Sequence, residues 1–227
     1  MNDRTRGSFR YGLIIVLSGF ASIVILNLLT LELGPSKVLA NYVQGNHPWG
    51  ILLSFSVFDS WGSIIGLLGV IPLFVPILIG KKDRHKIRVS TFFVGASMVL
   101  GILASVVWDM LHESTGISVA YGASGIAIVA LSIIFSESCI LITQTLRATE
   151  RASSSTRSAL IIVYLTLILT SLWFVLFIQP IFIPSNQYNW QVHEFGFGIG
   201  IISTLVFEYL ISIERYHDNL RRLNPLL

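Results

Sequence analysis

The stretch SALIIVYLTLILTSLWFVLFIQP, residues 158–180, decides the fold class of this chain. It contains no Asp, Glu, Lys or Arg, and its apolar residues would cover every face of a helix. At 1.5 Å per residue, a helix of this length crosses about 30 Å of hydrocarbon. A strand of a membrane barrel would instead alternate apolar and polar residues over about ten positions. The stretch therefore predicts a membrane-spanning helix.

Similar apolar stretches recur along the whole chain. Of its 227 residues, 53% are hydrophobic and 12% are charged, whereas soluble domains contain about 25% charged residues. We predict an all-α membrane protein, a single domain of residues 1–227 with six transmembrane helices. The predicted spans are 11–31, 51–79, 89–109, 122–143, 158–180 and 192–213. The first span is long for a signal peptide and no clean cleavage site follows it, so we interpret it as a retained helix.

The distribution of basic residues predicts the orientation in the membrane. With the N-terminus in the cytoplasm, every Lys and Arg except Lys37 falls on the cytoplasmic side. This pattern satisfies the positive-inside rule and favours an even number of spans in a cytoplasmic membrane. The formal net charge of +3 is spread over helix ends rather than gathered in one patch, so the lipid bilayer is an expected partner and nucleic acid is not.

Cysteine and histidine usage argues against metal or redox chemistry. Cys139 is the only cysteine, which excludes an intrachain disulfide and a cysteine-rich metal site. The histidines fall on both sides of the predicted membrane, at positions 47, 85, 112, 193 and 217. We therefore expect no metal and no cofactor.

Two side chains at the predicted outer face could carry chemistry. Ser124 lies in Gly-Ala-Ser-Gly, residues 122–125, and His193 begins His-Glu-Phe-Gly-Phe-Gly-Ile-Gly, residues 193–200. Both predicted spans run from outside to inside, so the two residues start them at the same face and could meet. A histidine about 3 Å from a serine hydroxyl can act as the base that makes it a nucleophile. Helix packing for the serine motif and an interfacial position for the histidine are the alternatives.

Small residues around both side chains favour a close approach of the helices. Gly196 and Gly200 form a small-xxx-small pair in the sixth span, and Gly125 follows the serine. Gly122 and Ala123 precede it, where exposed backbone N–H groups could stabilise an oxyanion.

Taken together, these motifs resemble the rhomboid family of intramembrane serine proteases. The resemblance covers six spans, a cytoplasmic N-terminus, a long first outer loop and the motifs at 122–125 and 193–200, and His-Pro-Trp-Gly-Ile-Leu-Leu-Ser at 47–54 is similar to the stretch before the second span. It implies that Ser124 is the nucleophile and His193 the general base of a dyad with no acidic third member. It also implies substrates that are transmembrane segments of proteins, cleaved near the outer face.

The chain departs from the rhomboid pattern at the second span. Rhomboids usually carry a histidine before this span and His and Asn on it, which assist the oxyanion hole; the corresponding positions are Phe58, Ser63 and Leu67. Gly50 replaces a common arginine, and Ile128 replaces an aromatic residue that packs on the histidine. Ser63 is left as a candidate hydroxyl donor for the oxyanion.

Three functions therefore stay open. The first is an intramembrane serine endopeptidase, and the second is a catalytically weak or inactive rhomboid-like protein that binds transmembrane helices. The third is a small transporter or channel subunit, to which only Pro72 and Pro76 in the second span point.

Overall fold

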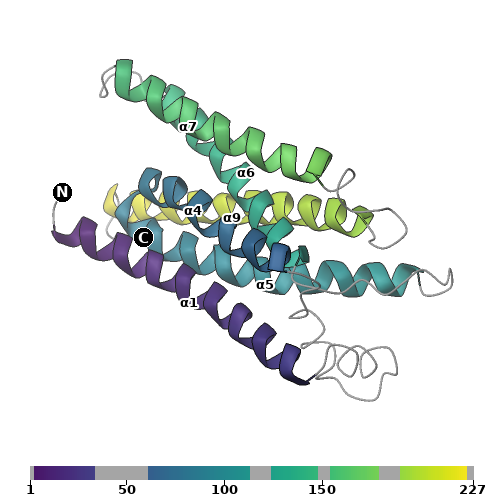
Figure 1. The fold of residues 1–227 in the computed structure, drawn as a ribbon. Coiled ribbons are helices and arrows are strands. Elements are labelled where there is room, and N and C mark those ends of the chain that lie inside the picture. Colours follow the sequence, from purple (N-terminus) through teal and green to yellow (C-terminus); the bar gives the residue numbers. More distant parts are fainter. Residues whose placement is uncertain (1–2, 34–60, 113–123, 148–153, 179–189, 224–227) are drawn as a thin grey trace.

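The structure, a computed structural model, describes residues 3–33, 61–112, 124–147, 154–178 and 190–223. Within these ranges the chain is helical apart from Lys81 and Lys82, which connect two of the helices. The helices are α1 (Asp3–Leu33), α4 (Trp61–Gly80), α5 (Asp83–His112), α6 (Ser124–Arg147), α7 (Ser154–Trp173) with its π-helical continuation η2 (Phe174–Ile178), and α9 (Trp190–Leu223). Figure 1 shows them as one bundle, with α6 crossing its middle.

Five of the described helices are long and apolar enough to cross a membrane. The candidate spans are Gly7–Leu26, Asp83–Ala104, Ser124–Arg147, Ser155–Leu176 and Val192–Glu214. This confirms the prediction of an all-α, multi-pass membrane protein. Large apolar side chains on the outer faces of α1, α7 and α9, such as Ile14, Leu169 and Ile202, are exposed as lipid contact requires.

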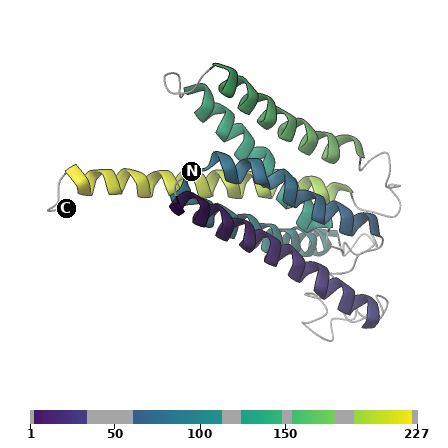
Figure 2. The ribbon, with the colours of Figure 1, turned by 60° about the vertical axis from the view of Figure 1, so that its left-hand side comes forward.

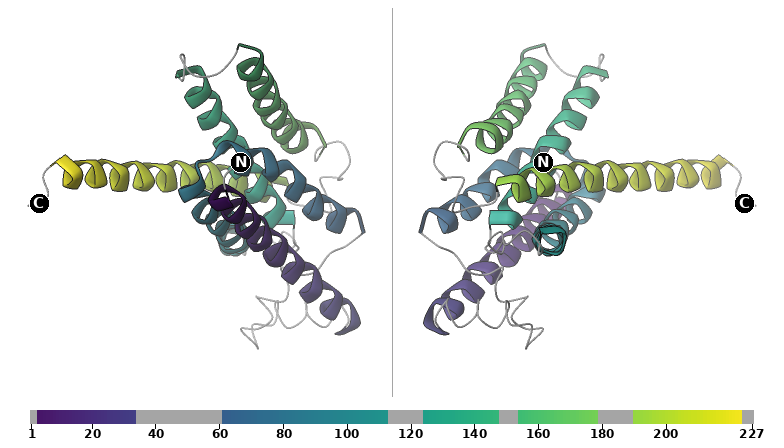
Figure 3. Two further views of the ribbon diagram at one scale, coloured as in Figure 1. Left: turned by 90° about the vertical axis from the view of Figure 1, so that its left-hand side faces the viewer. Right: turned by 90° about the vertical axis from the view of Figure 1, so that its right-hand side faces the viewer.

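The second predicted span, 51–79, is described only in part. Its residues 51–60 lie outside the described ranges, and the apolar part of α4, Leu67–Gly80, is shorter than the five candidate spans. The helix continues through Pro72 and Pro76 and ends at Gly80, so neither proline terminates it. The C-terminal helix is longer than the predicted span 192–213, and Figures 2 and 3 show the end of α9 extending beyond the other helices.

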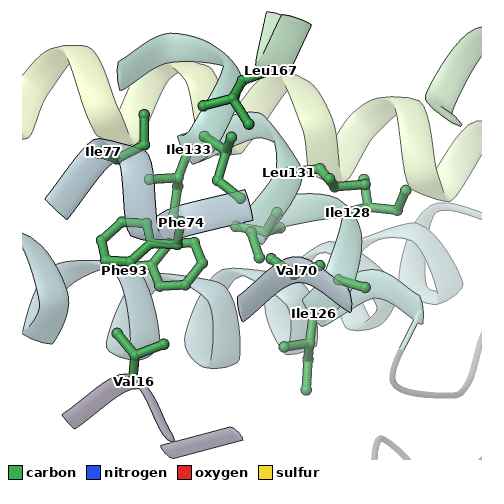
Figure 4. Close-up of a cluster of buried hydrophobic side chains, with 14 of the residues drawn as sticks. Val16, Val70, Phe74, Ile77, Phe93, Ile126, Ile128, Leu131, Ile133 and Leu167 are labelled. Carbon is green, nitrogen blue, oxygen red and sulfur yellow. The ribbon is translucent and has the colours of Figure 1, made fainter. Parts of the chain in front are cut away.

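Helix α6 forms the centre of the bundle. It contacts α4, α5, α7 and α9, and every residue from 125 to 134 is buried. Figure 4 shows Ile133 of α6 beside Phe74 of α4 and Phe93 of α5, whose rings stack with centroids 3.9 Å apart. Since lipid is as apolar as these side chains, the packing of the bundle depends on van der Waals contact rather than on the hydrophobic effect.

A buried ionic cluster joins the connection between α4 and α5 to two helices, α6 and α9, toward the end of the bundle opposite Ser124. The short connection between α4 and α5 carries Lys81, whose ammonium pairs with Glu137 of α6 and lies 2.7 Å from a carboxylate oxygen of Glu208 of α9. The side chain of Glu137 is fully buried, and that of Lys81 is 6% exposed. The carboxylate of Glu208 is thus paired inside the bundle, with Lys81.

Replacing Lys81 should destabilise the protein strongly. Lys81→Met leaves two carboxylates near each other without their cation, and breaking a buried pair costs about 3–5 kcal/mol. We expect a loss of this size in denaturant unfolding of the detergent-solubilised protein. A Glu137→Gln substitution added to Lys81→Met should recover part of the loss, because it removes one buried charge.

The matched control is Arg10→Met, which removes an exposed cation of α1 beside Phe9, whose ring lies 6.0 Å from Nζ of Lys86. It should change the free energy of unfolding by about 0.5 kcal/mol or less. Equal effects of Lys81→Met and Arg10→Met would contradict the role assigned to the cluster.

Candidate active site

The starts of α6 and α9 bring Ser124 and His193 together. Ser124 is the first residue of α6 and His193 lies in the first turn of α9. Both helix starts lie in the right half of Figure 1, whereas the start of α1, the end of α6 and the end of α9 lie toward the left. Nε2 of His193 is 2.9 Å from Oγ of Ser124, within hydrogen-bond distance. Topology therefore correctly indicated that these residues, 69 positions apart, could meet.

The histidine ring is held by packing. His193 is 7% exposed, and Ser124 is partly buried beside it. If Ser124 donates its proton to Nε2, the proton of a neutral imidazole is on Nδ1. Nδ1 is buried and has no hydrogen-bond partner among the residues that the structure describes. Within the described chain, therefore, no carboxylate orients the ring.

Gly200, two helical turns after His193, allows α9 to approach α6 closely. A Cβ added to Gly200 would overlap Oγ of Ser132, lie 2.9 Å from Cβ of the same serine and 3.2 Å from the carbonyl oxygen of Val129. Ser132 is itself fixed, because it is buried and its hydroxyl donates to that carbonyl at 2.7 Å. Any side chain at position 200 would therefore push the two helices apart.

Gly196 makes a looser contact than Gly200. A Cβ at this position would lie 3.7 Å from Cβ of Ala104 and from a methyl group of Val129, and 3.8 Å from a methyl group of Ile128. These are ordinary van der Waals distances. Of the two glycines predicted to pack, Gly200 has the stricter requirement. Ile128 lies on α6 one turn from Ser124 and is buried near Gly196.

Gly101, which was not among the predicted site residues, positions the start of α6. A Cβ on Gly101 of α5 would lie 2.7 Å from the backbone nitrogen and from Cα of Ile126, and 2.9 Å from the carbonyl carbon of Gly125. The backbones of α5 and α6 therefore touch one residue after Ser124. The sequence signal that could have indicated this contact is the pair of small residues Gly101 and Ala104, three positions apart. Gly101 faces α6, and Ala104 faces Gly196 of α9.

Other predicted site residues are described only partly or not at all. Gly122 and Ala123 lie outside the described ranges. Ser63 lies in α4, but its side chain is outside the described set. Gly125 is buried at the contact between α5 and α6, as its predicted packing role requires. Leu67, which the resemblance to rhomboids compares with a polar residue of that family, is fully buried in the apolar core.

The start of α6 offers an environment for a developing negative charge. The first N–H groups of a helix have no partner within the helix, and they form the positive end of its dipole. Ser124 is at this end, so an oxyanion formed beside its Oγ would face these N–H groups. Over the described ranges, no group of three His, Cys, Asp or Glu residues could hold a metal ion.

Comparisons with models of protein families, with curated proteins and with solved structures find no match to this chain.

Substitution of the two glycines of α9 should separate the tight contact from the loose one. Gly200→Ala should lower stability by about 1–3 kcal/mol through overpacking and lengthen the Ser124 to His193 distance. Gly196→Ala, the control, fills ordinary space and should be neutral or slightly stabilising.

Unfolding of both variants in detergent would measure the difference. Combining Gly200→Ala with Ser132→Gly, which removes the clashing side chain, should restore part of the lost stability. If Gly196→Ala proved as damaging as Gly200→Ala, the contact at Gly200 would not be the one that sets the helix spacing.

Proposed function

We propose that this chain is an intramembrane serine endopeptidase of rhomboid type, with Ser124 as nucleophile and His193 as general base. The observation that carries the proposal is the 2.9 Å separation of Ser124 Oγ and His193 Nε2 at the start of two neighbouring helices. The substrates proposed are transmembrane segments of other proteins. The proposal includes six spans, a cytoplasmic N-terminus and a site facing the outer side of a cytoplasmic membrane.

The reaction would proceed by acyl transfer to Ser124. Nε2 of His193 takes the hydroxyl proton while Oγ attacks the scissile carbonyl carbon. The resulting oxyanion is stabilised by N–H groups at the start of α6. The imidazolium then protonates the leaving amine, and the carbon–nitrogen bond breaks to give an acyl-enzyme. Water attacks the ester with His193 again accepting a proton, and Oγ leaves with that proton restored.

Transmembrane helices are suitable substrates for a site at the start of two membrane helices. A peptide bond inside a helix is hydrogen-bonded and shielded, so a substrate must unwind locally before its carbonyl meets Oγ. The partly exposed Ser124 at one end of the bundle is where such a segment would enter. Helix-destabilised transmembrane segments are therefore the expected preference.

Cleavage by purified protein in liposomes tests the proposal. Ser124→Ala and His193→Ala should each lower the cleavage rate of a helix-destabilised model substrate by about 10³-fold or more. Ser18→Ala is a matched control, because Ser18 is an exposed serine of α1 whose hydroxyl donates only to the backbone of its own helix. Undiminished cleavage by Ser124→Ala would remove the assignment.

The apolar side chain of Leu67 favours a second candidate function. Leu67 is fully buried where rhomboids usually place a polar oxyanion donor, and loss of one such donor costs about 10² to 10³ in rate. A rhomboid-like protein that binds transmembrane helices without cleaving them would tolerate this leucine.

Labelling by a fluorophosphonate probe separates the two candidates. An activated Ser124 should be modified covalently, and His193→Ala should slow the modification by about 10² or more, because general-base assistance is lost. Mass spectrometry of the labelled peptide identifies the serine. A wild-type protein that binds helical peptides but never reacts with the probe would favour the binder.

A further inference from the structure

A cavity of about 830 Å³ opens between α4, α6, α7 and α9 at the end of the bundle opposite Ser124. Its residues come from the end of α4, the connection to α5, His85 in the first turn of α5, the last turns of α6, the first half of α7 and the second half of α9. It is therefore separate from the Ser124 and His193 site and is not explained by the proposed peptidase activity.

Part of the cavity lining is apolar, and each of the four helices contributes one aliphatic side chain to it. These side chains are Ile79, Leu141, Leu160 and Ile211, which we call the apolar wall. Leu146 and Leu210, the neighbours of lining residues, are exposed at 48% and 58%. Since exposed leucines on membrane helices face lipid, the lipid-facing surface continues to the mouth of the cavity.

The polar part of the lining contains more basic than acidic side chains. Lys81 and Glu208 both line it, but the ammonium of Lys81 is already shared between the carboxylates of Glu208 and Glu137. Lys82 and Arg147 also line it, are exposed, and form no ion pair within the described part of the chain. Two cations are thus left to face a ligand, beside the polar side chains of Gln144 and Thr145.

The combination of cationic and apolar residues in the lining favours a lipid over a soluble anion as the ligand. A free phosphate needs only the cationic rim and would leave the apolar wall in contact with water. A phospholipid uses both parts, because its phosphate meets the cations while an acyl chain covers the leucines and isoleucines. Basic pockets between helices at the ends of membrane spans are suited to anionic headgroups.

We propose that this cavity binds an anionic phospholipid, with its phosphate between Lys82 and Arg147 and an acyl chain along the wall of Ile79, Leu141, Leu160 and Ile211. The ammonium and guanidinium groups supply charge and hydrogen bonds to the phosphate. The bound lipid fills the space between α7 and α9, which contact each other little and are both held by α6.

Native mass spectrometry of the full chain tests this proposal. The probes are phosphatidylglycerol and phosphatidylcholine with identical acyl chains, added to the detergent-solubilised protein. We expect one phosphatidylglycerol bound per chain, with an affinity about tenfold or more above that of phosphatidylcholine. Equal retention of the two lipids would overturn the proposal.

Single-charge variants identify the site. Lys82→Gln and Arg147→Gln should each weaken phosphatidylglycerol binding about fivefold, because one basic residue near a membrane surface contributes about 1 kcal/mol. Lys82→Arg should retain binding. Arg10→Gln removes an exposed cation of α1 and should also retain it. Equal losses in Arg10→Gln and the two cavity variants would show a general charge effect and overturn the site.

A competition experiment separates the lipid from a soluble anion. Inorganic phosphate at millimolar concentration should leave the bound phosphatidylglycerol in place, since phosphate lacks the acyl chain. If inorganic phosphate displaced phosphatidylglycerol from the wild-type protein, and Lys82→Gln abolished this effect, the cations alone would define the ligand. That result would overturn the assignment to a lipid.

Discussion

The close approach of α9 to α6 is the constraint on which the rest of the structure depends. At Gly200 the two helices are so near that a single added carbon would strike Ser132 and the carbonyl of Val129. A helix is stiff and rises 1.5 Å per residue, so a contact at Gly200 also fixes His193, about 10 Å further toward the helix start. In lipid, where apolar surfaces gain nothing from leaving water, small residues at a helix contact are what makes this tight packing favourable.

Three contacts hold one face of α9 at successive depths. His193 meets Ser124, Gly200 meets Ser132, and Glu208 meets Lys81. The spacings of seven and eight residues correspond to two helical turns each, which keeps the three residues on one side of the helix. The ionic cluster at one end and the serine and histidine at the other are therefore parts of one interface, and a shift of α9 along its axis would disturb both.

Hydropathy and topology were enough to predict much of this arrangement. Long uncharged stretches are interpretable because lipid allows few alternatives to a helix, and alternation of direction places the starts of the fourth and sixth spans together. The pairing of Lys81 with Glu137 and Glu208 was not predictable, because it depends on the rotation of each helix about its axis. The role of Gly101 was missed for the same reason, since glycine is frequent in membrane helices and its neighbour is set by tertiary packing. The prediction that residues 51–79 form the second of six spans depends on residues 51–60, which lie outside the described ranges.

Packing orients the imidazole of His193, because within the described chain no carboxylate bonds to its Nδ1. In triads of serine hydrolases an acid fixes the tautomer and the ring plane. Here the ring is almost completely buried, on a helix that Gly200 holds against α6, while Gly101 holds the serine from the other side. A ring buried in this way has little room to rotate, so the same close packing that a membrane bundle needs for stability also favours the alignment of Nε2 with Oγ. The price of such an arrangement is that distant glycines become as important to the geometry of the site as its own side chains.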